Sequence, residues 1–208
     1  MEAMTVRDVK AVFARLNDLM TENKQYLIEL DGVVGDGDLG LTMHQGFQKA
    51  HENVQAMSET DVGTVMAKAG MVIARHAPST MGTLMGTGFM KGGKAIQGHE
   101  TMDVEQLSVF FAAFLDGIMA RGKSEPGEKT VVDALHPAVE SLKDSLVQNR
   151  SLTEALNAAY EASVQGVEAT KEMVAQRGRA AYYGEGSKGK QDPGATVGML
   201  LFKGFAGL

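Results

Sequence analysis

Apolar residues recur at steps of three and four through most of this chain, the spacing of one buried face of an α-helix. In the first such segment the stripe consists of Val9, Val12, Phe13, Leu16, Leu19 and Met20. Alternating β-branched runs are few, tryptophan is absent and methionine reaches 14, a composition that favours helices packed through small residues. We therefore expect an all-α fold, with residues 1–208 forming a single domain.

Helix start and stop signals divide the chain into about eight helices with no convincing strand. Four starts have a clear N-cap, at Thr5, Asp61, Asp103 and Ser151, and Asp192-Pro193 gives a cap followed by proline at the first helical position. We expect the other three helices to begin near residues 42, 79 and 130. The first helix is predicted to reach about residue 30, and the seventh to run from 151 to about 178.

Between the first two predicted helices, residues 31–40 hold three aspartates and four glycines. Carboxylates this close repel one another unless a cation lies among them, and hard oxygen ligands suit Mg²⁺ or Ca²⁺. The order of residues does not match an EF-hand loop. The pattern favours a loop that binds metal and phosphate, with a solvated Asp-Gly turn as the alternative.

A second candidate phosphate site is the small-residue stretch 79–90, which opens the fourth predicted helix. A helix N-terminus offers unpaired N–H groups and a positive dipole end. Close helix packing through its glycines is the alternative interpretation, and from the residues alone we favour it. Residues 88–95 approach a P-loop but lack its Ser or Thr and a preceding strand, and the five histidines have no metal-ligand spacing.

Composition also excludes several classes of protein. The net charge of -6 argues against a nucleic-acid surface. The absence of cysteine excludes disulfides and thiolate metal sites. The first residues lack the apolar stretch of a signal peptide, so we expect none, and no apolar run approaches the length of a membrane span. We expect a cytoplasmic protein that does not associate with membranes.

Three segments taken together, 30–38, 127–138 and 178–195, resemble the nucleotide-binding L subunit of bacterial dihydroxyacetone kinase, which is also the C-terminal domain of the single-chain enzymes. The resemblance covers nearly the whole chain. It implies a closed antiparallel barrel of eight helices that holds ADP or ATP at one end.

The resemblance also implies roles for individual residues. Asp31, Asp36 and Asp38 would be catalytic and hold two Mg²⁺ ions, and Arg179 would be catalytic and reach the phosphates. The other implied nucleotide-binding residues are Leu39, Gly40, Leu41, Thr42, Ser79, Thr80, Gly122, Lys129, Thr130, Asp192, Pro193 and Gly194. Leu39 departs from the family, whose members usually have histidine there, and residues 78–82 are less glycine-rich than in relatives.

The implied function is that of a ketose kinase subunit. The ketose, dihydroxyacetone or a tetrulose, would be held covalently on a separate K subunit. This chain would present the phosphoryl donor, either exchanging ATP or a bound ADP that a phosphotransferase-system subunit recharges. The alternative is a nucleotide-holding regulatory module that contacts a transcription regulator. The aspartates favour catalysis, because sensing alone would not require two metals.

Overall fold

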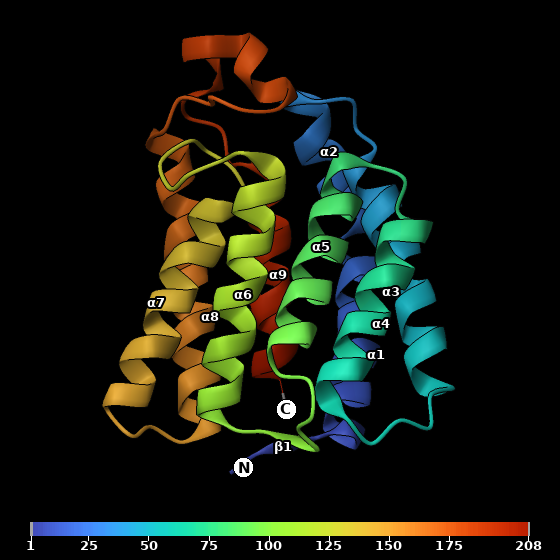
Figure 1. Ribbon diagram of the computed structural model, residues 1–208. Helices are drawn as coiled ribbons and strands as arrows, with labels where there is room; N and C mark the ends of the chain where they lie inside the picture. The colour runs from blue at the N-terminus through green and yellow to red at the C-terminus, as the bar shows by residue number, and fades with distance from the viewer. Residues whose placement is uncertain (1, 208) are drawn as a thin grey trace.

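The computed structural model describes residues 2–207, and helices dominate this part of the chain, which confirms the all-α prediction (Figure 1). The α-helices are α1 (Val6–Glu22), α2 (Lys24–Val34), α3 (Leu39–Gln55), α4 (Val62–His76), α5 (Thr80–Ala95), α6 (Val104–Gly122), α7 (Val132–Val147), α8 (Leu152–Ala169) and α9 (Pro193–Ala206). The short elements are the 3₁₀ helices η1 (Thr170–Glu172) and η2 (Arg179–Ser187) and the strands β1 (Met4–Thr5) and β2 (Thr101–Met102).

Every α-helix except α2 is a stave of a closed barrel. Neighbouring staves pack in the order α1, α3, α4, α5, α6, α7, α8 and α9, and α9 returns to pack against α1. Successive staves run in opposite directions, as Figure 1 shows, so the barrel is antiparallel. Helix α2 lies at one end, against α3, α9 and η2.

The barrel is filled by aromatic side chains. All eight phenylalanines of the sequence are fully buried. They come from α1, α3, α5, α6 and α9, and neighbouring rings meet at centroid distances such as 4.5 Å for Phe111 and Phe202. Burial of this kind is the main favourable term in folding. A continuous core therefore joins both halves of the chain and fixes the ends of the helices relative to one another.

The helix starts follow the predicted caps. Four predicted caps, Asp61, Asp103, Ser151 and Asp192, each accept a hydrogen bond from a backbone N–H in the first turn of their helix, and Ser79 does the same at the start of α5 without having been predicted as a cap. These bonds satisfy donors that a helix start leaves without an intrahelical partner. The loops that join α2 to α3, α4 to α5, α6 to α7 and α8 to α9 lie at the same end of the barrel (Figure 1).

The predicted helix boundaries are wrong in two parts of the chain. The first helix breaks at Asn23, whose side-chain amide donates to the Leu19 carbonyl at 2.8 Å and so competes with the helical pattern. Asp31 consequently belongs to α2 rather than to a loop, and α3 begins at Leu39, earlier than the expected Thr42.

The second error is the seventh predicted helix, which ends at Ala169 rather than near residue 178. The Thr170 hydroxyl donates back to the Val167 carbonyl at 2.6 Å, and the ammonium of Lys129 donates to the Thr170 carbonyl. The described residues also include two strands where none was expected, in which Met4 pairs with Met102. A run of two residues has no periodicity to detect.

Candidate functional site

A cavity of about 550 Å³ opens at the end of the barrel where the α2–α3, α4–α5, α6–α7 and α8–α9 loops lie. The predicted site residues that line it are Asp31, Asp36, Asp38, Leu39, Ser79, Thr80, Gly122, Lys129, Thr130, Arg179, Asp192, Pro193 and Gly194. They come from four separate stretches of the chain. The fold therefore brings together most of the residues singled out from the sequence.

Three aspartates converge at one side of this cavity. Asp31 lies in the last turn of α2, and Asp36 and Asp38 follow in the turn before α3. One carboxylate oxygen from each lies within 4.8 Å of the others. The approach is close because Gly35 has no side chain: a Cβ there would overlap Asp31 Oδ1.

The charge balance of this trio suits a divalent cation. Burial raises the pKa of the Asp38 carboxyl, and the Asp36 and Asp31 carboxylates raise it further, against a smaller opposing effect of Arg179. Arg179 contacts Asp36 at 2.6 Å, and its side chain is 67% exposed. A single exposed guanidinium leaves most of the negative charge of three carboxylates uncompensated. A set of oxygen donors alone fits Mg²⁺ or Ca²⁺.

Four helices begin at this cavity, with Asp38, Ser79, Val131 and Asp192 at the N-caps of α3, α5, α7 and α9. Their N-termini direct N–H groups and positive dipole ends toward the same space, where they stabilise an anion. Ser79 Oγ accepts from the Gly82 N–H at 3.1 Å and donates to Thr42 Oγ1 at 3.1 Å. The site thus has an acidic side for a metal and an N–H-rich side for phosphate.

Three predicted nucleotide contacts, Gly40, Leu41 and Thr42, are not among the cavity-lining residues. Gly40 packs against α2, where a Cβ would overlap the Lys24 carbonyl oxygen. Leu41 is 44% exposed and does not line the cavity. Thr42 lies behind Ser79 and bonds to it. Gly40 and Thr42 therefore pack at the start of α3 without lining the cavity, whereas Leu39 lines it.

Lys129 lines the cavity, but its ammonium is directed into the protein. The side chain is 1% exposed, and Nζ donates to the carbonyls of Thr170 and Lys190. Burial lowers the pKa of the Lys129 amine, while Asp192 and Asp133 oppose that shift. Its backbone is left-handed, with φ of 60°, a conformation that persists where surrounding contacts impose it.

Asp192 is a buried acid beside Lys129. Its Oδ2 accepts from the Ala195 N–H at 2.7 Å, and it is 6% exposed. Burial raises the pKa of Asp192 to about 7, although the Ala195 hydrogen bond and the charge of Lys129 lower it. This carboxyl therefore changes its charge near neutral pH.

Several residues of the site were missed at the level of sequence. Asp133 accepts from the N–H groups of Gly127 at 2.5 Å and Thr130 at 2.7 Å, and so shapes the turn before α7. It follows Lys129 and Thr130 in a segment already recognised, which was the available signal. The apolar part of the cavity wall consists of Val34, Pro78, Met81, Leu84, Val131 and Ala180. Apolar wall residues have no motif that separates them from core.

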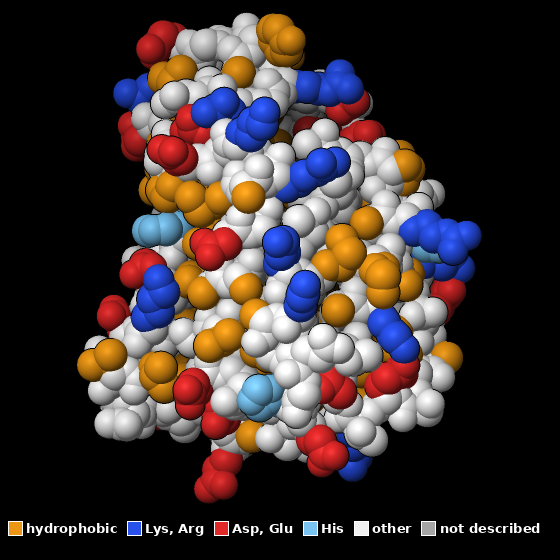
Figure 2. Space-filling view, in the orientation of Figure 1, with side chains coloured by type: hydrophobic (Ala, Val, Ile, Leu, Met, Phe, Trp, Pro, Cys, Tyr) orange, Lys and Arg blue, Asp and Glu red, His pale blue; other side chains and the backbone are white. Residues whose placement is uncertain are grey.

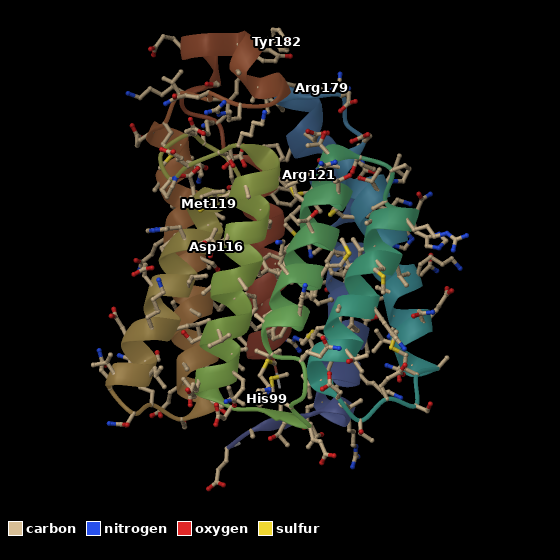
Figure 3. The ribbon with its side chains drawn as sticks, in the orientation of Figure 1. His99, Asp116, Met119, Arg121, Arg179 and Tyr182 are labelled. Atoms are coloured by element: carbon tan, nitrogen blue, oxygen red, sulfur yellow. The ribbon has the colours of Figure 1, made fainter. Side chains whose placement is uncertain are left out.

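A lobe formed by residues 170–192 stands over the site. Figure 2 shows it above the barrel, with basic, acidic and apolar side chains on the visible face. In Figure 3, Arg179 lies where η2 meets the end of α2, whereas Tyr182 points outward from the tip of the lobe. Tyr182 is 93% exposed. The lobe therefore presents one cation to the aspartates and an aromatic ring to solvent.

Comparison with known proteins gives the family. Residues 33–207 match the DAK2 domain model. The chain is 39% identical over 189 residues to the "PEP-dependent dihydroxyacetone kinase, ADP-binding subunit DhaL" of Escherichia coli K12, covering 91% of this chain and 90% of that protein. It is 30% identical over 201 residues to the L-erythrulose 1-kinase of Mycolicibacterium smegmatis, covering 95% of this chain but only 34% of that enzyme.

A solved structure agrees with both sequence relatives. The dihydroxyacetone kinase of C. freundii in complex with AMP-PNP and Mg²⁺ superposes with a TM-score of 0.74 at 25% identity, covering 99% of this chain and 34% of that one. Within residues 2–207, every helix is too short or too polar to cross a bilayer. The chain belongs to the DAK2-domain family, and within it to the kinase subunits of the dihydroxyacetone kinase L type.

Proposed function

We propose that this chain is the nucleotide- and Mg²⁺-binding subunit of a dihydroxyacetone kinase, and that ADP is its resident nucleotide. The observation that carries the proposal is the convergence of Asp31, Asp36 and Asp38 in a cavity where four helices begin. Carboxylates and helix N-termini in one cavity match the two needs of a nucleoside diphosphate bound through metal: oxygen ligands for the cation and N–H donors for phosphate.

The three aspartates would hold two Mg²⁺ ions, as in the resemblance drawn from the sequence. Bound Mg²⁺ would neutralise phosphate charge and help to align the phosphoryl donor. The apolar wall that includes Met81 and Leu84 suits the nucleoside, since both residues line the cavity. Leu39 offers no side-chain donor, so at this point the nucleotide would meet backbone N–H groups at the start of α3.

Arg179 would act on the transferred phosphoryl group. Phosphoryl transfer needs little covalent chemistry from the protein, and depends on positioning and on stabilising charge that develops in the transition state. The guanidinium already lies against Asp36 and is largely exposed. It can therefore turn toward an anion bound beside the aspartates, and both faces of the transferred group would meet positive charge.

ADP as the resident nucleotide is favoured over freely exchanging ATP by the pattern of identity. The E. coli relative, at 39%, is named as the ADP-binding subunit of a PEP-dependent enzyme, whereas the erythrulose kinase is 30% identical. A bound ADP would then be recharged in place by a phosphotransferase-system subunit. The ketose, proposed to be dihydroxyacetone, would be held on a separate K subunit, so this chain alone would not phosphorylate sugar.

The test is to purify the chain and identify by chromatography the nucleotide released on denaturation, before and after treatment with EDTA. We expect ADP, lost on chelation, and restored sugar phosphorylation when the chain is combined with its ketose-binding and phosphotransferase partners. The Asp36→Asn variant should retain no ADP and support no turnover. An empty protein that binds Mg·ATP reversibly would replace the ADP scheme by an ATP scheme, and turnover by Asp36→Asn would refute the catalytic assignment.

A further inference from the structure

The lobe of residues 170–192 carries Arg179. It has a rising limb, which leaves the end of α8, and a returning limb, which leads into α9. Hydrogen bonds between these two limbs close the lobe at its base. The Gly189 N–H donates to the Lys171 carbonyl at 2.7 Å, and the Asp192 N–H donates to Thr170 Oγ1 at 3.1 Å. The base therefore joins the end of α8 to the start of α9. Arg179 lies near the far end, where its position depends on how firmly the base and the rising limb are held.

Lys129 bridges the two limbs from below. Its Nζ donates to the Thr170 carbonyl on one limb and to the Lys190 carbonyl on the other. The side chain is 1% exposed, and its contact with the Thr170 carbonyl is buried, whereas the contact with the Lys190 carbonyl is partly buried. A buried carbonyl left without a donor is costly, and the ammonium has three donors to give. One cation thus ties the limbs together across the base.

Glu128, the preceding residue, holds the rising limb. Its carboxylate accepts two hydrogen bonds from the Arg177 guanidinium, both of 2.8 Å, and its carbonyl accepts from the Gln176 N–H at 3.1 Å. Arg177 is two residues before Arg179. Lys129 therefore binds the lobe at its base, and Glu128 binds it close to Arg179. Asp133 in turn holds the turn that contains both residues.

We propose that Lys129 is a positioning residue that places Arg179 against the phosphate end of the site and does not itself contact the nucleotide. The proposal rests on the proposed function. For Nζ to reach a bound phosphate it would have to abandon the two carbonyls that it satisfies. The route from Lys129 to the reacting group instead runs through the base of the lobe, up the limb that Glu128 holds, to Arg179 and its partner Asp36.

The test is a double-mutant cycle on Mg·ADP affinity, measured by titration calorimetry for Lys129→Met, Arg179→Gln and the double variant. If Lys129 acts through Arg179, each single change weakens binding by about tenfold, and the double variant is no weaker than the poorer single variant within about twofold. Lys123→Met is the matched control, because Lys123 lies in the same turn with a left-handed φ of 51° but is exposed. It should bind as the unmodified chain does.

A second readout needs no nucleotide. Chymotrypsin cleavage after Tyr182 and Tyr183, followed by mass spectrometry, reports opening of the lobe, and Lys129→Met should be cut about tenfold faster than Lys123→Met. If Lys129→Met does not fold, Glu128→Gln takes its place in both assays, with expected changes of about two- to fivefold.

The outcomes separate the two claims. Unchanged affinity in Lys129→Met, or losses that multiply in the double variant, would overturn the positioning role, as would equal cleavage rates for the two lysine variants. Failure of the unmodified chain to bind Mg·ADP would instead refute the proposed function, and the cleavage rates alone would then decide whether Lys129 holds the lobe.

Discussion

At the scale of single residues, the site contains carboxyl groups whose ionised form is disfavoured by burial. Asp38 is partly buried beside two other carboxylates, and Asp192 is buried under α9 beside Lys129. Such groups lower the stability of the empty protein and become favourable when a ligand supplies the missing charge. The signs of these pKa shifts lead to one prediction for each aspartate.

Replacing Asp38 by asparagine should raise the stability of the metal-free protein. The folded-state pKa of Asp38 lies above its ordinary value, so ionisation of this group costs stability as pH rises through that interval. The neutral amide removes that cost and the repulsion from Asp36. Thermal unfolding near pH 7 should show a higher melting temperature for Asp38→Asn in EDTA, and no further rise on adding Mg²⁺ and ADP. A lower melting temperature in EDTA would contradict the repulsion described here.

Replacing Asp192 by asparagine should change how stability depends on pH. The pKa of Asp192 in the folded protein is about 7, whereas the ordinary value for an aspartate carboxyl is 3.8. Between these values the folded state binds more protons than the unfolded state, so the native protein loses stability as pH rises from about 4 to about 7. The amide of the asparagine variant would keep an oxygen for the Ala195 N–H but would not titrate.

The stability advantage of Asp192→Asn should therefore grow between about pH 4 and pH 7 and remain constant above that range. Urea unfolding at several pH values measures the difference. A difference that does not vary with pH would mean that Asp192 is not protonated in the folded state at mildly acidic pH.

At the scale of elements, glycines decide how closely α4 and α5 approach. A Cβ on Gly70 would lie 2.7 Å from the Gly86 carbonyl oxygen and 2.8 Å from the Met90 nitrogen. Both are backbone atoms, which move only if the helices separate. The sequence left two interpretations open for the small residues of α5, packing or phosphate binding. The structure confirms the packing, since Gly86 and Gly93 lie against α4, and the first residues of the helix line the cavity. Phosphate binding at this helix start stays a prediction.

Gly70→Ala should therefore destabilise the protein by about 1–3 kcal/mol through overpacking. Gly32→Ala is the matched control, because Gly32 is also helical and a Cβ there would have nothing within 4 Å. Alanine is the better helix former, so this variant should gain about 0.5–1 kcal/mol. Chemical unfolding of both variants measures the two free energies, and a loss at Gly32 similar to that at Gly70 would refute the packing argument.

The helical elements were predictable where caps and apolar stripes are local. Ser79, Asp103 and Ser151 begin helices because the bonding side chain and its N–H partner lie within three residues. The break at Asn23 and the end of α8 were not predictable in this way. The second depends on Lys129, 41 residues away in the sequence, which takes the Thr170 carbonyl. The sequence around Thr170 does not indicate that a lysine far away in the chain will donate a hydrogen bond to its carbonyl.

The same division holds for the site. The aspartate trio and the Asp192 cap were recognised because charged and capping residues stand out in the chain, whereas Ser79 was named only through the family resemblance. The direction of the Lys129 side chain, the support given by Asp133 and Glu128, and the apolar wall depend on how four loops meet. Gly40, Leu41 and Thr42 show the converse: adjacency to the trio in sequence did not place them on the cavity wall.

At the scale of the whole molecule, the barrel is a rigid frame with its chemistry at one end. Phenylalanines from five helices fill its interior, while the aspartate trio, the helix N-termini and Arg179 lie together at one end of the closed ring. The lobe is held by the hydrogen bonds of Lys129, by the ion pairs of Arg177 with Glu128 and Arg179 with Asp36, and by a small apolar cluster of Val34, Ala175 and Ala180. Such a division lets the lobe respond to ligand without loosening the core.

The central claim is that metal and nucleotide bind together through the aspartate trio, and the most direct measurement is calorimetric titration of ADP into nucleotide-free protein with and without Mg²⁺. We predict one binding site with Mg²⁺, no detectable binding in EDTA, and at least about a hundredfold loss of affinity in Asp36→Asn. Asp144→Asn, an exposed acid on α7, should bind as the unmodified chain does. ADP binding of equal strength in EDTA, or an Asp36→Asn variant with unchanged affinity, would contradict the account.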